Sequence, residues 1–114
     1  MKDDRERLRD ILEAIQAIEK YAARGRAACE TDELLQVWMV HHIQIIGEAA
    51  RRLSEALKNR HPEVPWTEIV AMRNILVHDY FAADMNEVWL AVERGIPQLK
   101  QQITDFLREL EESK

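Results

Sequence analysis

The chain has 114 residues, 46% of them hydrophobic and 32% charged, with a net charge of −5 and a single cysteine. This size predicts one domain, residues 1–114, and the composition excludes a disordered chain and a disulfide framework. The negative balance argues against broad, nonspecific binding of nucleic acid, which needs many phosphate-neutralising cations, but it leaves room for a local cationic cleft.

The first two helices are predicted from the spacing of apolar residues and from capping residues. The first spans about residues 4–23 and places apolar residues on one face. The second begins at Thr31 or Asp32, either of which can cap a helix, and continues to about residue 58. Within it, the small residues around Gly47 in the sequence IGEAA would let another helix approach closely.

The third helix is expected to start around Pro65 and to contain the sequence RNILVHDY, residues 73–80. After a short break at FAAD, Asp84 and Glu87 fit a capping box for a fourth helix that runs to about Leu110. Pro97 should kink or interrupt this helix just after Gly95. The predicted fold class is therefore all-α, an up-down bundle of four main helices with short connections. Its many apolar positions favour a dimer.

The sequence gives no sign of a membrane segment or a resident cofactor. No run of about 18 apolar residues is present, and the charged start MKDDRERLRD lacks the apolar region of a signal peptide. These features predict a cytoplasmic protein that makes no membrane contact. His41 and His42 are adjacent and point about 100° apart on a helix, which makes them a poor metal pair, so we expect no metal site.

The stretch RNILVHDY separates polar from apolar residues on a helix. At about 100° per residue, His78 lies about 140° from Arg73, whereas Tyr80 lies almost above Arg73. Asn74 and His78 are four residues apart and can touch. One copy holds Arg73 and His78 in a loose arc, but two copies that face each other would bring two arginines and two histidines to one cleft.

This set of side chains suits the internal cleavage of RNA without a metal. A histidine can remove the proton of a ribose 2′-hydroxyl near neutral pH, and an arginine can stabilise the extra negative charge of the phosphorane. The alternative is an exposed helix face that carries polar residues without a chemical role.

The sequence MRNILVHDYF resembles the signature of the HEPN superfamily and, more narrowly, of its HepT toxins: an arginine, four residues, a histidine, one residue and a tyrosine. Arg73, His78 and Tyr80 match this pattern position by position, and Asn74 supplies the usual polar residue. The segments DRERLRDILEAIQAIEKY and IIGEAARRLSEALKNRHPEVPWTEIVAMRN resemble the first helix and the middle of the family. The resemblance thus covers nearly the whole chain.

The resemblance implies an all-α homodimer with a composite active site between the subunits. It implies a metal-independent endoribonuclease, the toxin of a toxin–antitoxin pair, with RNA as its substrate and Arg73 and His78 as catalytic residues. It also implies a partner, the minimal nucleotidyltransferase MntA, that neutralises the toxin by transferring AMP to the motif tyrosine, here Tyr80. No cofactor is expected.

Several further assignments stay open at the level of sequence. Glu48 is a supporting residue that either orients active-site groups or is simply a polar residue at a helix crossing. The cationic residues Arg51, Arg52, Lys58 and Arg60 either guide RNA or form a solvated helix face. The alternative function is a non-catalytic helical module that docks a minimal nucleotidyltransferase and presents its substrate. Such a module has no need of the full arginine, histidine and tyrosine set.

Overall fold

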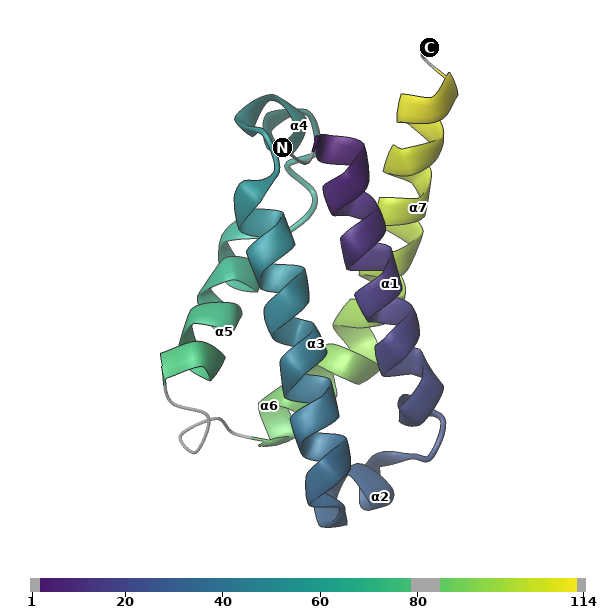
Figure 1. Cartoon of the computed structure of the whole chain (residues 1–114), viewed down its shortest axis with the longest axis vertical. Helices are drawn as coiled ribbons and strands as arrows, with labels where there is room; N and C mark the ends of the chain where they lie inside the picture. Colours follow the sequence, from purple (N-terminus) through teal and green to yellow (C-terminus); the bar gives the residue numbers. More distant parts are fainter. Residues whose placement is uncertain (1–2, 79–84, 113–114) are drawn as a thin grey trace.

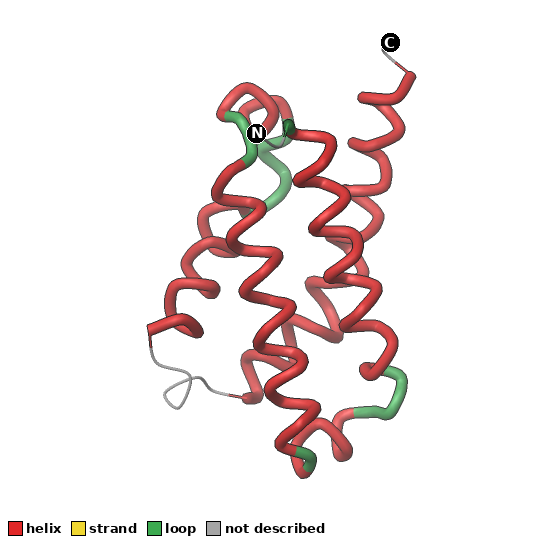
Figure 2. The backbone as a smooth tube through the Cα atoms, in the orientation of Figure 1, coloured by secondary structure: helices red, strands yellow, loops and turns green. Residues whose placement is uncertain are grey.

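The computed structural model describes residues 3–78 and 85–112, and for residues 75–78 it describes the backbone alone. In chain order, the elements are α1 (Asp4–Ala22), α2 (Arg26–Thr31), α3 (Glu33–Arg52), α4 (Glu55–Arg60), α5 (Trp66–His78), α6 (Met85–Leu90), the π-helical segment η2 (Ala91–Gly95) and α7 (Ile96–Glu112). The described residues contain no β-strand, which confirms the predicted all-α class (Figure 2).

The helices α1 and α3 run side by side through the middle of the bundle (Figure 1). α7 packs against α1, and α5 packs against α3 on the opposite side of the molecule. The four main helices that the sequence predicts are therefore α1, α3, α5 and the α6–α7 continuation. In the described part of the chain, every helix is too short or too polar to cross a membrane.

The core is built mainly from apolar residues of α1, α3 and α7. The spacing of apolar residues along α1 puts one side of that helix inside, and its buried residues are Leu8, Ile11, Ala14, Ile15 and Ile18. α7 buries Ile103 completely, and α3 buries Met39 almost completely. Full burial of one such side chain stabilises the fold by roughly 1.5–3 kcal/mol. This apolar core holds the long helices in fixed positions, and α5 is added to its outer side.

The second predicted helix is shorter than expected, and this part of the prediction is wrong. α3 ends at Arg52, and a separate helix, α4, follows after Leu53 and Ser54, whose backbones are extended. The Ser54 hydroxyl oxygen caps α4 by accepting a hydrogen bond from the Leu57 backbone N–H. The Asp4 carboxylate accepts from both the N–H and the hydroxyl of Ser54, at 2.9 and 2.5 Å. This contact between distant parts of the chain stabilises the break.

The short helix α2 was not predicted. It follows Gly25, whose φ of +90° is a conformation that residues with a side chain rarely adopt. The predicted cap at Asp32 is present, because its carboxylate accepts a hydrogen bond from the Leu34 N–H at 2.9 Å and starts α3. The other predicted cap, Asp84, lies outside the described residues.

The predicted interruption near Pro97 is confirmed, and it takes the form of a π-helical turn. η2 ends at Gly95, and α7 begins at Ile96, one residue before Pro97. Proline has no N–H to donate, and its ring crowds the carbonyl four residues earlier, so the regular α-helical ladder cannot continue through it. The wider π-helical turn relieves this conflict while the chain stays helical.

Candidate active site

The site forms where α5 crosses α3, and Gly47 permits the crossing. A Cβ atom at Gly47 would overlap the Cβ of Arg73, lie 2.7 Å from its Cγ and lie 3.3 Å from the Ile69 carbonyl oxygen. The predicted role of Gly47 in a close helix approach is therefore confirmed. The residue that packs onto it is Arg73, so the same contact places the motif arginine directly beside α3.

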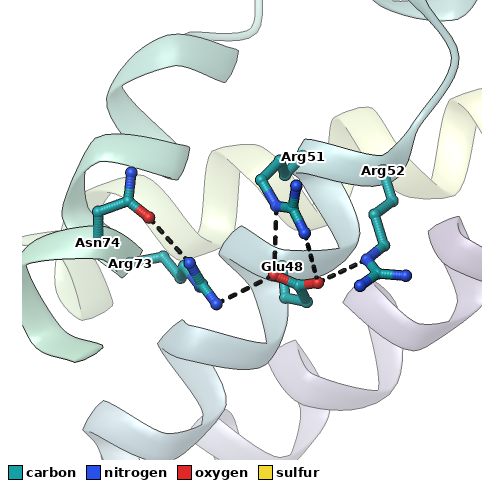
Figure 3. Close-up of polar contacts among 5 residues, drawn as sticks. All are labelled: Glu48, Arg51, Arg52, Arg73 and Asn74. Carbon is teal, nitrogen blue, oxygen red and sulfur yellow. Dashed lines mark hydrogen bonds and ion pairs between the residues drawn. The ribbon is translucent and has the colours of Figure 1, made fainter. Parts of the chain in front are cut away.

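The Arg73 guanidinium is held by two oxygen atoms (Figure 3). Its Nη2 lies 3.2 Å from Oε2 of Glu48, and its Nη1 donates to Oδ1 of Asn74 at 2.9 Å. The side chain remains 25% exposed. An arginine held in this way loses little further freedom when it binds a phosphate, and its planar donors suit the bidentate recognition of phosphate oxygens.

Glu48 is the centre of an arginine cluster that consists of Glu48, Arg51, Arg52 and Arg73 (Figure 3). Oε1 of Glu48 accepts from Nη2 of Arg51 at 3.0 Å and from Nε of Arg52 at 2.5 Å. Three guanidinium groups surround one carboxylate, so the cluster carries a net positive charge in a chain whose net charge is −5. The local concentration of positive charge that the sequence left room for is thus present.

The same contacts fix the charge of Glu48. The pKa of Glu48 is lowered from 4.5 to about 2. The main cause is its hydrogen bond with Arg51, and the hydrogen bond with Arg52 and the charges of both arginines add to the effect. Burial of the carboxyl group opposes this shift. The carboxylate is therefore ionised near neutral pH, has no proton to donate as a general acid and is only a weak base. Its geometry suits a residue that positions the Arg73 guanidinium.

Of the five predicted site residues, the described residues bring three together: Arg73, Asn74 and Glu48. His78 is the last residue of α5, and its backbone is helical, but its side chain lies outside the description. Tyr80 lies outside the described residues altogether. Five residues along a helix correspond to a rise of about 7.5 Å and a rotation of about 140°, so the backbone keeps Arg73 and His78 apart within one chain.

Sequence reasoning did not assign Arg51 and Arg52 to Glu48. Both lie on α3, three and four residues after Glu48, which is the spacing at which helical side chains meet. That signal was present in the sequence. The cross-helix partner, Arg73, could not be assigned to Glu48 by spacing, because the contact depends on how α5 crosses α3.

The side chains of His41, His42 and Cys29 lie in surroundings that indicate a structural role. In His42, Nδ1 lies 2.8 Å from the Trp38 carbonyl oxygen, and the rings of His41 and His42 are nearly perpendicular, at 87°. Cys29 is buried, and this burial, with a smaller effect of Asp32, raises the pKa of its thiol. Among the described side chains, those of residues 3–74 and 85–112, no three of His, Cys, Asp or Glu gather in an arrangement that could hold a metal ion.

The all-α bundle, the arginine that its motif helix presents and the family match given next place the chain in the class of HEPN-type helical ribonuclease domains. Within that class, the model of the family described as "Ribonuclease HepT-like" matches residues 11–106. The chain belongs to the HepT-like ribonuclease family.

Relatives from archaea agree with this assignment. The chain is 39% identical over 97 residues to the protein named "Probable ribonuclease HepT" of Thermococcus cleftensis, a match that covers 82% of this chain and 86% of the relative. It is 35% identical over 114 residues to the protein named "Gamma-glutamylcyclotransferase and putative RNase" of Methanocaldococcus jannaschii. That match covers 99% of this chain but 51% of the relative, so the chain spans about half of that protein's length. No solved structure matches the chain.

Proposed function

We propose that this protein is an endoribonuclease that cleaves RNA without a metal ion. The observation that carries the proposal is the ordered, partly exposed Arg73 guanidinium, held by Glu48 and Asn74 on the helix whose last residue is His78. The names of the relatives, which refer to RNases, support the same class of substrate. We expect the protein to act on its RNA substrate in the cytoplasm.

In the proposed reaction, a histidine removes the proton from the ribose 2′-hydroxyl, and the 2′-oxygen attacks the neighbouring phosphorus. The bond from phosphorus to the 5′-oxygen then breaks, and that oxygen takes a proton from a histidine. The products are a 2′,3′-cyclic phosphate and a 5′-hydroxyl. Arg73 binds the phosphorane oxygens, where the extra charge develops, while Glu48 holds Arg73 in place. Asn74 positions reacting groups near His78 at the same site.

The two proton transfers favour a composite site in a homodimer. The helix geometry separates Arg73 from His78 within one chain, and two facing copies of α5 would supply two arginines and two histidines to one cleft. One His78 then acts as the base and its symmetry mate as the acid. Light scattering at micromolar concentration tests this part of the proposal, and a monomer near the chain mass of 13.4 kDa would contradict it.

The family resemblance extends the proposal to a toxin controlled by a partner nucleotidyltransferase of the MntA type. In that step the Tyr80 hydroxyl oxygen attacks the α-phosphorus of ATP, pyrophosphate leaves, and AMP remains on the tyrosine. The attached phosphate would pair with Arg73 and compete with the RNA phosphate. Tyr80→Phe should keep ribonuclease activity and escape this neutralisation. If AMP is still transferred to the Phe variant and silences it, the modified residue is elsewhere.

The direct test of the ribonuclease proposal is RNA cleavage in the presence of EDTA, with analysis of the product ends. We expect 2′,3′-cyclic phosphate ends with the wild type and no cleavage with His78→Ala, while circular dichroism shows an unchanged helical fold. A non-catalytic docking module would bind its partner but cleave no RNA. Wild-type rates in the His78→Ala protein would refute the role of the histidine.

A further inference from the structure

Beside the arginine cluster, the surface is hollowed between α4 and α5. The hollow has a volume of about 600 Å³, and its lining includes Arg51 of α3, Lys58 of α4 and Thr67, Ala71 and Asn74 of α5. Its volume lies in the range of sites that hold small ligands. We call it the α4–α5 hollow.

Two residues belong both to the α4–α5 hollow and to the contacts of the active site. Arg51 lines the hollow and binds Glu48, and Asn74 lines the hollow and accepts a hydrogen bond from Arg73. The hollow therefore opens directly beside the guanidinium that is proposed to bind the cleaved phosphate. A polymer bound at Arg73 would have its neighbouring unit within reach of the hollow.

The chemistry of the lining fits one nucleotide. Arg51 and Lys58 provide cations, and Asn59, Asn74 and Thr67 provide neutral donors for phosphate or sugar oxygens. Val70 and Ala71 add apolar surface on α5 for a ribose or base. Lys58 is only 16% exposed, with its Nζ 3.2 Å from Oε1 of Glu55. Glu55 is itself 83% exposed, so it can turn into solvent at little cost when a phosphate replaces it.

A second cavity offers an instructive contrast. It lies between α3, α5 and α7, has a volume of about 130 Å³, and has mostly apolar walls that include Ile43, Ile69 and Leu99. None of its lining residues is charged. It cannot compete with the α4–α5 hollow for an anionic ligand.

We infer that the α4–α5 hollow is a subsite for an RNA nucleotide one step beyond the two that flank the cleaved phosphodiester, with Lys58 as its phosphate-binding residue. This inference rests on the proposed function, because Arg73 must bind RNA for the next nucleotide to reach the hollow. The subsite adds binding energy outside the reacting bond. It should therefore raise kcat/KM for longer RNA and leave the cleavage of the shortest substrate unchanged.

The kinetic test compares a dinucleotide, which has one phosphodiester, with a hexanucleotide. Lys58→Gln removes the cation, and Ala71→Trp fills the hollow. The controls on α4 are Arg60→Gln and Ala56→Trp, exposed positions outside the lining. We expect kcat/KM for the hexanucleotide to fall about tenfold in both hollow variants, the effect of one charge-assisted contact, with dinucleotide cleavage within about twofold of the wild type. Equal losses on both substrates, or no loss on either, would overturn the inference.

A binding test separates failure of the subsite from failure of the proposed ribonuclease. A fluorescent hexamer of 2′-deoxynucleotides cannot be cleaved by 2′-hydroxyl attack, so its affinity reports binding alone. We expect the slope of log Kd against log salt to fall by about 0.7 in Lys58→Gln, the contribution of one single-strand phosphate contact, and to stay unchanged in Arg60→Gln. If the slopes of the two variants are equal, the subsite is refuted even when RNA is cleaved. If the slope falls as expected but no RNA is cleaved, the hollow is a nucleotide site and the proposed chemistry fails.

Discussion

The two sides of α3 differ in what they pack against. On the side toward the core, α3 buries apolar residues such as Met39 and Ile46, which are 1% and 3% exposed. On the side toward α5, it presents Gly47 and the charged Glu48, and it receives an arginine. One helix thus provides stability on one face and a cationic site on the other. The apolar core beneath the site holds its helices in place, although the site itself contributes little to stability.

The largest effect on stability should come from the core face. Met39→Ala removes an almost fully buried side chain and leaves a cavity in the core, so we expect the free energy of unfolding to fall by roughly 2–5 kcal/mol. Urea denaturation followed by circular dichroism measures this loss. A change below about 1 kcal/mol would show that this face is less tightly packed than the structure indicates.

An intermediate effect on stability is expected where α3 and α5 touch. Gly47→Ala forces a methyl group into Arg73, and this overpacking should cost roughly 1–3 kcal/mol of stability and lower the rate of RNA cleavage. Gly95→Ala is the matched control, because a Cβ atom there meets no other atom within 4 Å. The control should be neutral or stabilised by up to about 1 kcal/mol, since alanine favours helices over glycine. Equal effects of both substitutions would contradict the close approach at Gly47.

A smaller effect is expected for the carboxylate on the α5 side. Glu48→Gln keeps the shape of the side chain but removes its charge, and at neutral pH it should cost about 1 kcal/mol or less in stability, because Glu48 is partly exposed. The cleavage rate should fall more clearly, because Arg73 loses the group that positions it. The loss should appear in kcat rather than in KM. Glu111→Gln removes the charge of an exposed ion pair with Arg9 and is the control. It should change neither the stability nor the cleavage rate.

The pH dependence of stability tests the same residue. Since the pKa of Glu48 is lowered from 4.5 to about 2, its ionised form favours the folded state, and its contribution is complete above about pH 4.5. That contribution should disappear as pH falls toward about 2, so the stability difference between the wild type and Glu48→Gln should shrink over this interval. Denaturation at a series of pH values measures it. A difference that does not depend on pH would refute the clamped carboxylate.

Local sequence patterns predict some parts of the structure and miss others. The core face of α1 and the start of α3 follow from apolar spacing and from the Asp32 cap, which are local signals. The break between α3 and α4 depends on Asp4, which binds Ser54 from 50 residues away, and no local pattern reveals such a contact. At the site, the motif identifies Arg73 and Asn74, but the crossing of two helices decides that Glu48 is the partner of Arg73. The roles of His78 and Tyr80 stay predictions.

The most direct test of the central claim is the single-turnover rate of RNA cleavage by Arg73→Ala beside Arg9→Ala, with the helical content of both proteins checked. Arg9 forms an exposed ion pair with Glu111 far along the chain, so its loss should leave the rate within about twofold. Loss of Arg73 removes the group proposed to stabilise the phosphorane and should lower the rate by about 10²–10³. Similar rates in the two folded variants would contradict the assignment of Arg73 as the phosphate-binding residue of the active site.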